Sequence, residues 1–435
     1  MIHHILPTLF VAVLLSVVII FAVYVKYKAL TNRFWTAQPC FHFFDIHFYL
    51  STPAVISDEL PTTNKYCDFI DVQTFPYKEL SDVQKEEMVG FLQKNYDHLH
   101  VQSKDRILPF FEGFSRKNNQ PIVSFFRKAQ HNVIDDDDDD DEEKKKKKGR
   151  ITHVSSSIIA TMTSRTMLFY ANARYVADIY YVDFLCVDKF NRKSGVAPKI
   201  IQTHEYNQRH ANKDIKISLF KREGELTFIV PLCAFKTHVY KVMLSNKVWE
   251  ERRENQRFIR VTLTNLHVWQ HCIHEQLLAS IKFKVMMIND MGNIMELIKS
   301  ENIWMFMVVD DCDAMSGFYV FRLCSDPEKE KEKEKEGGID SGSVSCIASV
   351  NFDTTTIDIF MWGFFNCLKW IQDKVYTESG WMLQMEEISD NAVLLEELSN
   401  DNESFRFLQT IPCAYFFYNY AMPPILPNEA FLMVT

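Results

Sequence analysis

Polar and apolar residues follow one another along this chain in two patterns, one typical of helices and one typical of strands. Four stretches have helical character, two in each half of the chain: residues 81–96, 197–209, 291–300 and 360–375. Six apolar runs rich in β-branched and aromatic residues predict strands: residues 121–126, 154–162, 175–187, 303–309, 317–323 and 345–352. The mixture predicts an α+β protein, in which a mixed β-sheet is flanked by helices.

The order of these segments repeats. A helix, a strand, a charged turn, a strand and a helix occur once in each half, without visible sequence identity between the halves. This succession predicts an internal duplication with a boundary near residues 244–255. We therefore expect a segment 1–28, a first half 29–245 and a second half 246–435.

The N-terminal segment differs from the rest. Residues 5–25 carry no charge and are about as long as the ~20 residues that cross a bilayer. Lys26, Lys28 and Arg33 follow this run, which predicts a single-pass membrane anchor with the body of the protein in the cytosol. A cleaved signal peptide is the alternative.

Composition narrows the class of protein. A length of 435 residues gives room for two domains, and a net charge of -9 provides no basic surface for nucleic acid. Ten cysteines without a CxxC pair indicate free thiols in a reducing compartment. The charged tracts at 135–148 and 328–336 are predicted to be solvated loops.

One stretch carries the chemistry. The apolar run 181–187 ends in a basic turn that contains Lys189 and Arg192, and a helix is expected from Val196 onwards. The first amides of a helix have no partner within the helix, and its dipole favours negative charge there. A strand, a basic turn and a helix start in this order predict an anion site.

The same stretch resembles the conserved block of protein N-myristoyltransferases, NFLCVHKKLRSKRVAP. Without a gap, FLCVDKFNRKSGVAP matches it at Phe184, Leu185, Cys186, Val187, Lys189, Arg192, Val196, Ala197 and Pro198. RFWTAQPC at residues 33–40 is similar to the family's KFWSTQPV, and YFFYNY at 415–420 is similar to YYLYNW. The three matches occur in the order that the family has.

The resemblance implies a fold and an activity. The fold would be two fused copies of the GCN5-related acetyltransferase (GNAT) fold, of which the half 29–245 would bind acyl-CoA and the half 246–435 would bind the peptide. The activity would be transfer of myristate from myristoyl-CoA, a co-substrate and not a permanently bound cofactor, to the N-terminal glycine of peptides or proteins. The backbone amides of Phe184 and Leu185 would stabilise the thioester oxygen. The myristoyl-CoA site would consist of Arg33, Phe34, Trp35, Phe184, Leu185, Cys186, Val187, Arg192, Lys193, Ser194, Gly195, Val196, Ala197 and Pro198.

On the acceptor side, the resemblance places Tyr96 and Asp97 in a loop that receives basic peptide residues, and makes the terminal carboxylate of Thr435 the catalytic base. The family's Gly-rich KFGxGDG block is replaced here by FRFLQTIPCA at residues 405–414. This loss leaves an alternative open, namely a degenerate protein that binds acyl-CoA or a lipidated peptide without turnover. A further alternative is an acetyltransferase with a short acyl pocket.

His267, His271 and His274 have the spacing of one helical face, where three imidazoles can bind zinc. No carboxylate accompanies them as in HExxH, and the family needs no metal. We therefore predict no metal site.

Overall fold

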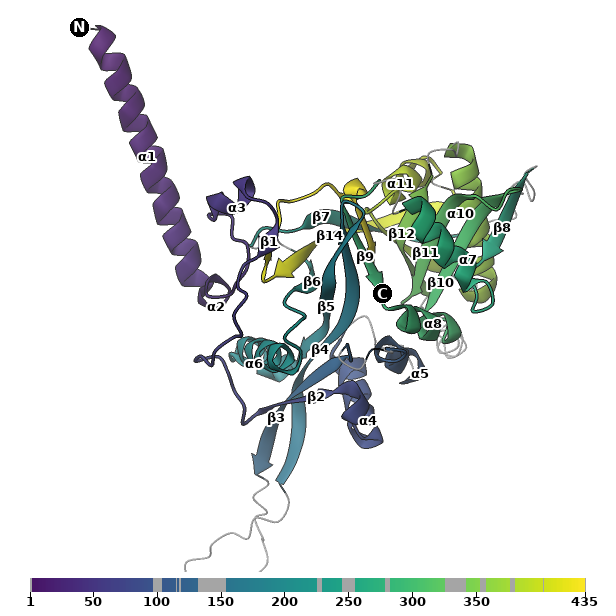
Figure 1. Cartoon of the computed structure of the whole chain (residues 1–435), viewed down its shortest axis with the longest axis horizontal. Coiled ribbons are helices and arrows are strands. Elements are labelled where there is room, and N and C mark those ends of the chain that lie inside the picture. The colour runs from purple at the N-terminus through teal and green to yellow at the C-terminus, as the bar shows by residue number, and fades with distance from the viewer. Residues whose placement is uncertain are drawn as a thin grey trace, which may run out of the picture.

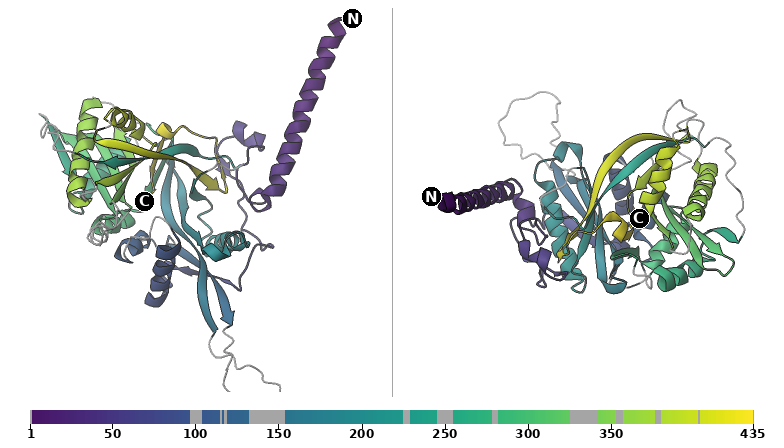
Figure 2. Two further views of the ribbon diagram at one scale, coloured as in Figure 1. Left: turned by 180° about the vertical axis from the view of Figure 1, so that it is seen from behind. Right: turned by 90° about the horizontal axis from the view of Figure 1, so that it is seen from above.

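The computed structural model describes residues 2–96, 104–114, 116, 119–131, 154–224, 229–244, 255–277, 282–324, 342–352, 357–375, 380–401 and 403–434. A fourteen-stranded mixed sheet runs through the body, and helices cover it (Figures 1 and 2). The strand order is β16-β9-β4-β5-β6-β14-β7-β13-β12-β11-β10-β8, with β3 on β4 and β2 on β3.

The N-terminal part of the chain supplies the following elements. The helices are α1 (Ile2–Thr31), α2 (Arg33–Thr36), α3 (Ile46–Leu50), α4 (Asp82–Asn95), α5 (Lys104–Ile107) and α6 (Val196–Ala211), with short 3₁₀ turns η1 (Tyr77–Glu79), η3 (Leu108–Phe111) and η4 (Lys189–Asn191). The strands are β1 (Ala54–Val55), β2 (Val72–Pro76), β3 (Ile122–His131), β4 (Val154–Ala171), β5 (Arg174–Val187), β6 (Ser218–Glu223) and β7 (Cys233–Val242).

The C-terminal part continues the same sheet. Its helices are α7 (Leu266–Cys272), extended by a π-helical turn η5 (Ile273–Leu277), α8 (Met291–Lys299), α10 (Ile357–Val375), α11 (Asn391–Asn400) and the 3₁₀ turn η6 (Pro427–Glu429). Its strands are β8 (Gln256–Arg260), β9 (Val285–Asn289), β10 (Ile303–Asp310), β11 (Met315–Leu323), β12 (Ser343–Asn351), β13 (Trp381–Glu386), β14 (Phe405–Tyr418), β15 (Tyr420–Ala421) and β16 (Ala430–Met433).

The segments expected from the sequence are present as α4, α6, α8 and α10 and as β3, β4, β5, β10, β11 and β12, so the α+β prediction is confirmed.

Hydrogen bonds between neighbouring residues explain why α4 begins where it does. Ser81 Oγ accepts a hydrogen bond from the backbone amide of Gln84 at 3.3 Å, and the backbone amide of Ser81 donates to Gln84 Oε1 at 2.9 Å. This reciprocal pair forms a capping box.

The same succession of elements occurs twice. A helix, three antiparallel strands, a second helix and a strand parallel to the third appear first as α4, β3-β4-β5, α6 and β6, and again as α8, β10-β11-β12, α10 and β13. This agrees with the expected duplication. That each copy is a GNAT fold stays a prediction.

Strands cross the predicted boundary at residue 245. β14 lies between β6 and β7, and β9 pairs antiparallel with β4. β16 in turn pairs parallel with β9, near the middle of the molecule (Figure 1). The division into two halves stays a prediction, because each half contributes strands to the other's part of the sheet.

The helix α1 projects from the body (Figures 1 and 2). Its segment Phe10–Thr31 has a mean hydropathy of 2.4, and none of the segment is buried. Phe21 and Tyr24 contact Phe43 near the body, with ring centroids 6.0 and 5.8 Å apart. By length and composition this helix suits a membrane anchor or a signal sequence, and no localisation follows from the fold.

A close backbone contact joins the two parts of the chain. Gly113 has a φ of +85°, and a Cβ at Gly292, in α8, would lie 2.0 Å from the Gly113 carbonyl oxygen. Asn293 donates to the carbonyl oxygens of Pro109 at 3.1 Å and Glu112 at 2.9 Å, which fixes the same junction.

We expect Gly292→Ala to destabilise the protein, because a methyl group there must displace backbone. The thermal unfolding midpoint should fall by at least ~5 °C. Gly90→Ala in the exposed interior of α4 is the matched control, since no atom lies within 4 Å of its added Cβ. The control should be neutral or stabilising by about 0.5–1 kcal/mol. Equal midpoints for the two variants would contradict the tight junction.

Candidate functional site

A cavity of about 880 Å³ lies where two parallel strands part. β5 and β6 are paired only from Tyr180↔Ser218 to Val182↔Phe220. Beyond that point β5 stays with β4 and β6 stays with β14, and residues from both diverging strands line the cavity. The separation of two hydrogen-bonded strands therefore creates the opening.

A β-bulge in β5 stands at this point. The pairing with β4 shifts between Thr163↔Asp183 and Thr161↔Cys186, so Phe184 and Leu185 oppose Met162. Phe184 has a φ of +49°, a backbone conformation that costs a bulky residue about 1–3 kcal/mol. Surrounding contacts must offset this cost.

Hydroxyl groups of β4 hold the bulge. Thr161 Oγ1 donates to the Phe184 carbonyl at 3.1 Å, and Thr163 Oγ1 donates to the Asp183 carbonyl at 3.0 Å. The Phe184 ring packs against those of Tyr96, Phe110 and Phe111, with centroids 5.6–6.0 Å apart. The two buried threonines fix the carbonyls on one side of the strand.

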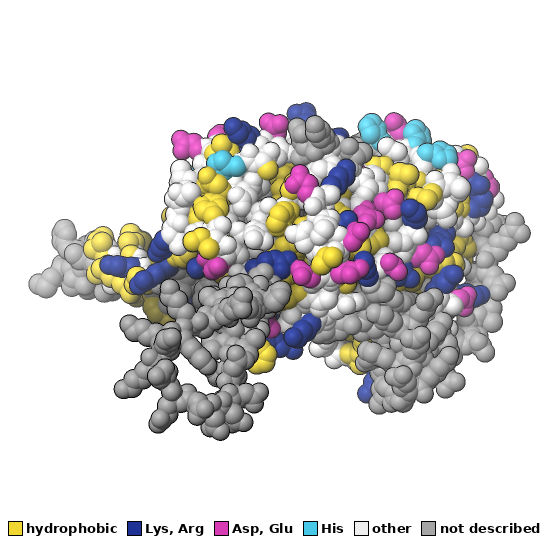
Figure 3. Space-filling view, turned by 90° about the horizontal axis from the view of Figure 1, so that it is seen from below, with side chains coloured by type: hydrophobic (Ala, Val, Ile, Leu, Met, Phe, Trp, Pro, Cys, Tyr) yellow, Lys and Arg dark blue, Asp and Glu magenta, His cyan; other side chains and the backbone are white. Residues whose placement is uncertain are grey.

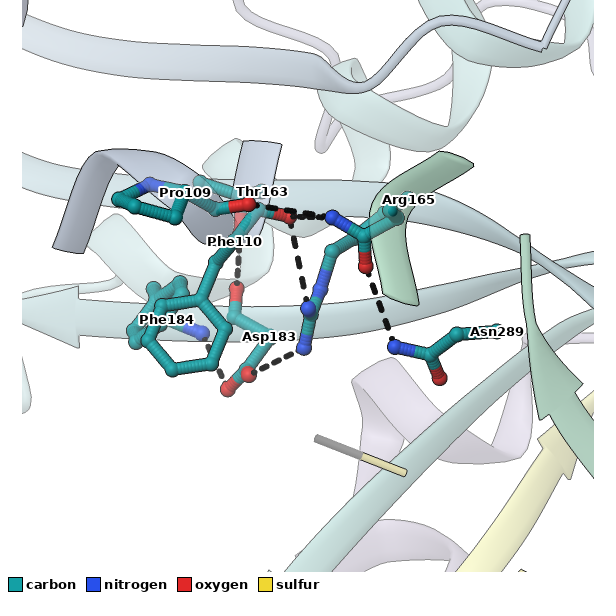
Figure 4. A network of polar contacts seen from close by, with 8 residues as sticks. Pro109, Phe110, Thr163, Arg165, Asp183, Phe184 and Asn289 are labelled. Carbon is teal, nitrogen blue, oxygen red and sulfur yellow. Dashed lines mark hydrogen bonds and ion pairs between the residues drawn. The ribbon is translucent and has the colours of Figure 1, made fainter. Parts of the chain in front are cut away.

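The Phe184 amide already has an acceptor. It donates to Asp183 Oδ1 at 2.7 Å, while Asp183 Oδ2 forms an ion pair with Arg165 at 3.4 Å (Figure 4). Burial lowers the pKa of Arg165, and the neighbouring Asp183 opposes that effect. The resemblance assigns the backbone amides of Phe184 and Leu185 to the thioester oxygen. One of them, that of Phe184, is already hydrogen-bonded to a carboxylate oxygen.

The basic turn has the backbone of an anion site. Lys193 and Gly195 have φ values of +64° and +84°, and Gly195 precedes the first residue of the sixteen-residue helix α6. Arg192, which lines the cavity, donates from Nε to the Val187 carbonyl at 3.3 Å. The turn thus directs α6's unpaired first amides and a guanidinium group to one edge of the cavity.

The structure brings together most, but not all, of the residues expected from the sequence. The cavity is lined by Trp35, Tyr96, Phe184, Leu185, Cys186, Val187, Arg192 and Ala197. Arg33, Phe34, Lys193, Ser194, Gly195, Val196 and Pro198 do not line it. Phe34 is instead buried beneath the cavity wall, with its ring centroid 5.1 Å from that of Trp35. Asp97 and Thr435 lie outside the described residues.

One region of the cavity wall is aromatic and contains a carboxyl group. Trp35 stacks on Phe220 at 5.7 Å, and Glu205 Oε2 accepts a hydrogen bond from Gln208 at 2.6 Å. Burial raises the pKa of Glu205 to about 8, against a smaller opposing effect of Arg209. Glu205 is thus mostly neutral at pH 7, which suits a wall that accepts an alkyl chain.

The opposite wall is charged and was missed by sequence reasoning. Lys221 of β6 pairs with Glu386 of β13 at 3.0 Å, and Arg322 of β11 lies close to this pair. Nothing in the sequence marks these residues as one group, because they lie in three separate strands, far apart in the chain.

Two C-terminal segments bear on the acceptor side. The residues that replace the Gly-rich block form β14, of which Gln409 and Ile411 line the cavity. β16 and the following Val434 are buried, and Val434 belongs to the same apolar cluster as the cavity-lining Tyr181. The chain therefore enters the core at its last described residue.

Within the described residues, no group of three or more His, Cys, Asp or Glu side chains has a metal-binding arrangement. His267 and His271 lie on α7, and His274 lies in the π-helical turn. His274 contacts Glu275 at 3.6 Å, and both of these side chains are largely exposed.

Comparisons with solved structures identify the fold. Two Saccharomyces cerevisiae N-myristoyltransferase structures with bound myristoyl-CoA superpose with TM-scores of 0.58 and 0.57, at 14% and 12% identity. The matches cover 91% of this chain in both cases, and 90% and 94% of those chains. A third, with myristoyl-CoA and inhibitors, gives 0.58 at 13% identity over 92% of this chain and 94% of the other. No family model and no curated protein matches the sequence.

The chain thus has the N-myristoyltransferase fold. At 12–14% identity the likeness establishes the architecture alone.

The raised pKa of Glu205 predicts a pH effect on stability. Since the folded-state pKa of about 8 exceeds the ordinary 4.5, the folded protein binds the additional proton. The contribution of Glu205 to the free energy of unfolding is fully present below pH 4.5 and is lost as the pH rises through 8. Burial lowers the pKa of the neighbouring His204 to about 3. Its effect on the free energy of unfolding has the opposite sign to that of Glu205 and is confined to pH values below about 6.5. Between pH 6.5 and 8.5, the free energy of unfolding of the wild type should fall with rising pH. In Glu205→Gln this fall should be smaller, by on the order of 1 kcal/mol or more.

Denaturant unfolding across this pH range measures the effect. Glu79→Gln at an exposed site is the control and should leave the slope of the wild type unchanged. Parallel pH profiles for wild type and Glu205→Gln would show that the carboxyl group is ionised in the folded protein.

Proposed function

We propose that this protein is an N-myristoyltransferase-like acyltransferase, which moves myristate from myristoyl-CoA to the amine of an N-terminal glycine. The observation that carries the proposal is the bulge at Phe184 and Leu185, held by Thr161 and Thr163 at the point where β5 and β6 part. A bulge in a cavity wall exposes backbone amides that regular pairing would consume.

On the donor side, the thioester lies against the bulge and the CoA phosphates lie at the basic turn. Arg192 and the first amides of α6 bind phosphate, and Trp35, Phe220 and the neutral Glu205 border the acyl chain. The amide of Leu185, and that of Phe184 once Asp183 releases it, stabilise the negative charge that develops on the thioester oxygen.

On the acceptor side, the glycine amine attacks the thioester carbonyl carbon. The N–C bond forms, the C–S bond breaks, and the CoA thiolate leaves and takes up the proton that the attacking nitrogen loses, so that the products are the amide and CoA thiol. A free amine is required, and an α-ammonium group with a pKa near ~8 must first lose a proton. We assign that proton transfer to the terminal carboxylate of Thr435, supported by the burial of the chain up to Val434. Tyr96 borders the acceptor path, and Asp97 is proposed to lie there too.

A second candidate is a protein that binds acyl-CoA or a lipidated peptide without turnover. Two observations favour it. Asp183 occupies the Phe184 amide, and a strand, β14, replaces the Gly-rich loop of the family. Either arrangement would permit binding while it slows the chemical step.

We also propose that α1 anchors the protein in a membrane with the body in the cytosol. The unburied apolar segment Phe10–Thr31 and the basic residues Lys26, Lys28 and Arg33 support this topology. Basic side chains lie where the apolar helix meets the body (Figure 3).

Arg192→Glu tests the donor site. A carboxylate beside the CoA phosphates should weaken binding of myristoyl-CoA to the full-length protein at least ~10-fold, about 1.4 kcal/mol. Lys213→Glu, an exposed charge reversal beyond the other end of α6, is the control and should bind normally. Calorimetric titration measures both. An affinity unaffected by Arg192→Glu would refute the assignment of the turn.

Turnover separates the two candidates. Full-length protein with myristoyl-CoA and a Gly-initiated peptide should yield the N-myristoyl peptide, detected by mass spectrometry. Appending Gly-Ser after Thr435 moves the terminal carboxylate and should abolish transfer while myristoyl-CoA binding stays within about twofold. If the extended protein is as fast as the native one, Thr435 is not the base. Tight binding without any product would establish the second candidate.

A further inference from the structure

Arg322 is a cavity-lining cation that, in the described part of the chain, no close ion pair balances. Nearby, Lys221 is paired with Glu386 at 3.0 Å, and Arg165 is paired with Asp183 at 3.4 Å. For the partly buried Arg322, no carboxylate of the described residues lies within ion-pair distance. Among the described residues, its guanidinium group thus lines the cavity without a counter-ion of its own.

The surroundings keep this group charged and in place. Burial by itself would lower the pKa of Arg322, but nearby acidic groups, of which the Glu386 carboxylate is ionised at neutral pH, outweigh burial and raise the pKa. Arg322 lies in register between Ile303 of β10 and Ser345 of β12, so its backbone belongs to the interior of the sheet. A fixed guanidinium presents a planar set of donors that matches a carboxylate.

Its position separates it from the donor site. Arg192 and the start of α6 stand at the β5 edge of the cavity, whereas Arg322 belongs to β11, two strands away from Gln384 and Met382 of β13, which also line the cavity. The donor's phosphates have their own basic turn. The anion that Arg322 receives is then a group of the acceptor or the terminal carboxylate of Thr435, which lies outside the described residues, and peptide binding separates the two.

We propose that Arg322 binds a carboxylate of the acceptor, and that this protein selects glycine-initiated peptides with an acidic side chain near the N-terminus. The inference rests on the proposed function for the identity of the acceptor. It reverses the charge preference that the family resemblance implies, in which an acidic loop receives basic residues.

Peptide binding tests this selection without any turnover. Four pairs of C-terminally labelled hexapeptides begin with Gly and differ only by Asp or Asn at position 2, 3, 4 or 5. Fluorescence anisotropy with full-length protein, in the presence and absence of myristoyl-CoA, gives the affinity ratio for each pair. For at least one position, the Asp peptide should bind at least ~10-fold more tightly than its Asn partner. Ratios near one at every position would overturn the proposal.

Variants locate the effect. Arg322→Gln should reduce the Asp/Asn ratio below about threefold, Arg322→Lys should retain part of it, and Arg322→Glu should favour a Lys peptide. Arg257→Gln, on the edge strand β8 outside the cavity, is the control and should keep the wild-type ratio. Thermal unfolding midpoints show whether each variant is folded. The retained charge of Arg322→Lys provides a test should Arg322→Gln fail to fold.

The outcomes distinguish this inference from the proposed function. An Asp preference that disappears in Arg322→Gln supports the inference even if the protein neither binds myristoyl-CoA nor transfers myristate. If Arg322→Gln instead weakens the Asp and Asn peptides equally, Arg322 acts on a group of the protein itself, such as the Thr435 carboxylate, and the inference is wrong.

Discussion

The separation of β5 from β6 is the constraint on which the rest of the site depends. Two strands that begin as a parallel pair cannot both keep their hydrogen bonds once each follows a different neighbour, β4 in one case and β14 in the other. The bulge at Phe184 turns β5 away at that point, and the threonine hydroxyls of β4 hold the carbonyls that the bulge displaces. A cavity follows because neither strand's partner fills the gap.

Most of the buried charges around this polar cavity are balanced. Asp183 pairs with Arg165 and Glu386 pairs with Lys221, whereas the buried Glu205 is neutralised by protonation. An unpaired buried charge costs several kcal/mol, so these pairings are a condition of the fold as well as features of the site. Asp183 has both roles, because the same carboxylate also engages the Phe184 amide.

Strands exchanged between the two parts of the chain keep the walls of the cavity together. β14 is inserted between β6 and β7, and β9 and β16 extend the edge of β4. The close contact of Gly113 with Gly292 adds a point where the backbones meet directly. Residues of the early and late parts of the chain therefore face one cavity, with a donor edge from the early part and a charged wall to which both parts contribute.

The sequence determined the local elements and one edge of the site. Helices such as α4 are encoded by their own caps and apolar spacing, and the block around Phe184 and Arg192 is contiguous, so both were predictable without tertiary information. Thr161, Asp183, Lys221, Glu205 and Arg322 lie on different strands or helices, and only the pairing of β4, β5, β6, β11 and β13 brings them to one cavity. Strand register is a long-range property, because it depends on which apolar faces pack together. The sequence of one strand therefore does not show which residues of other strands its charged side chains will lie near.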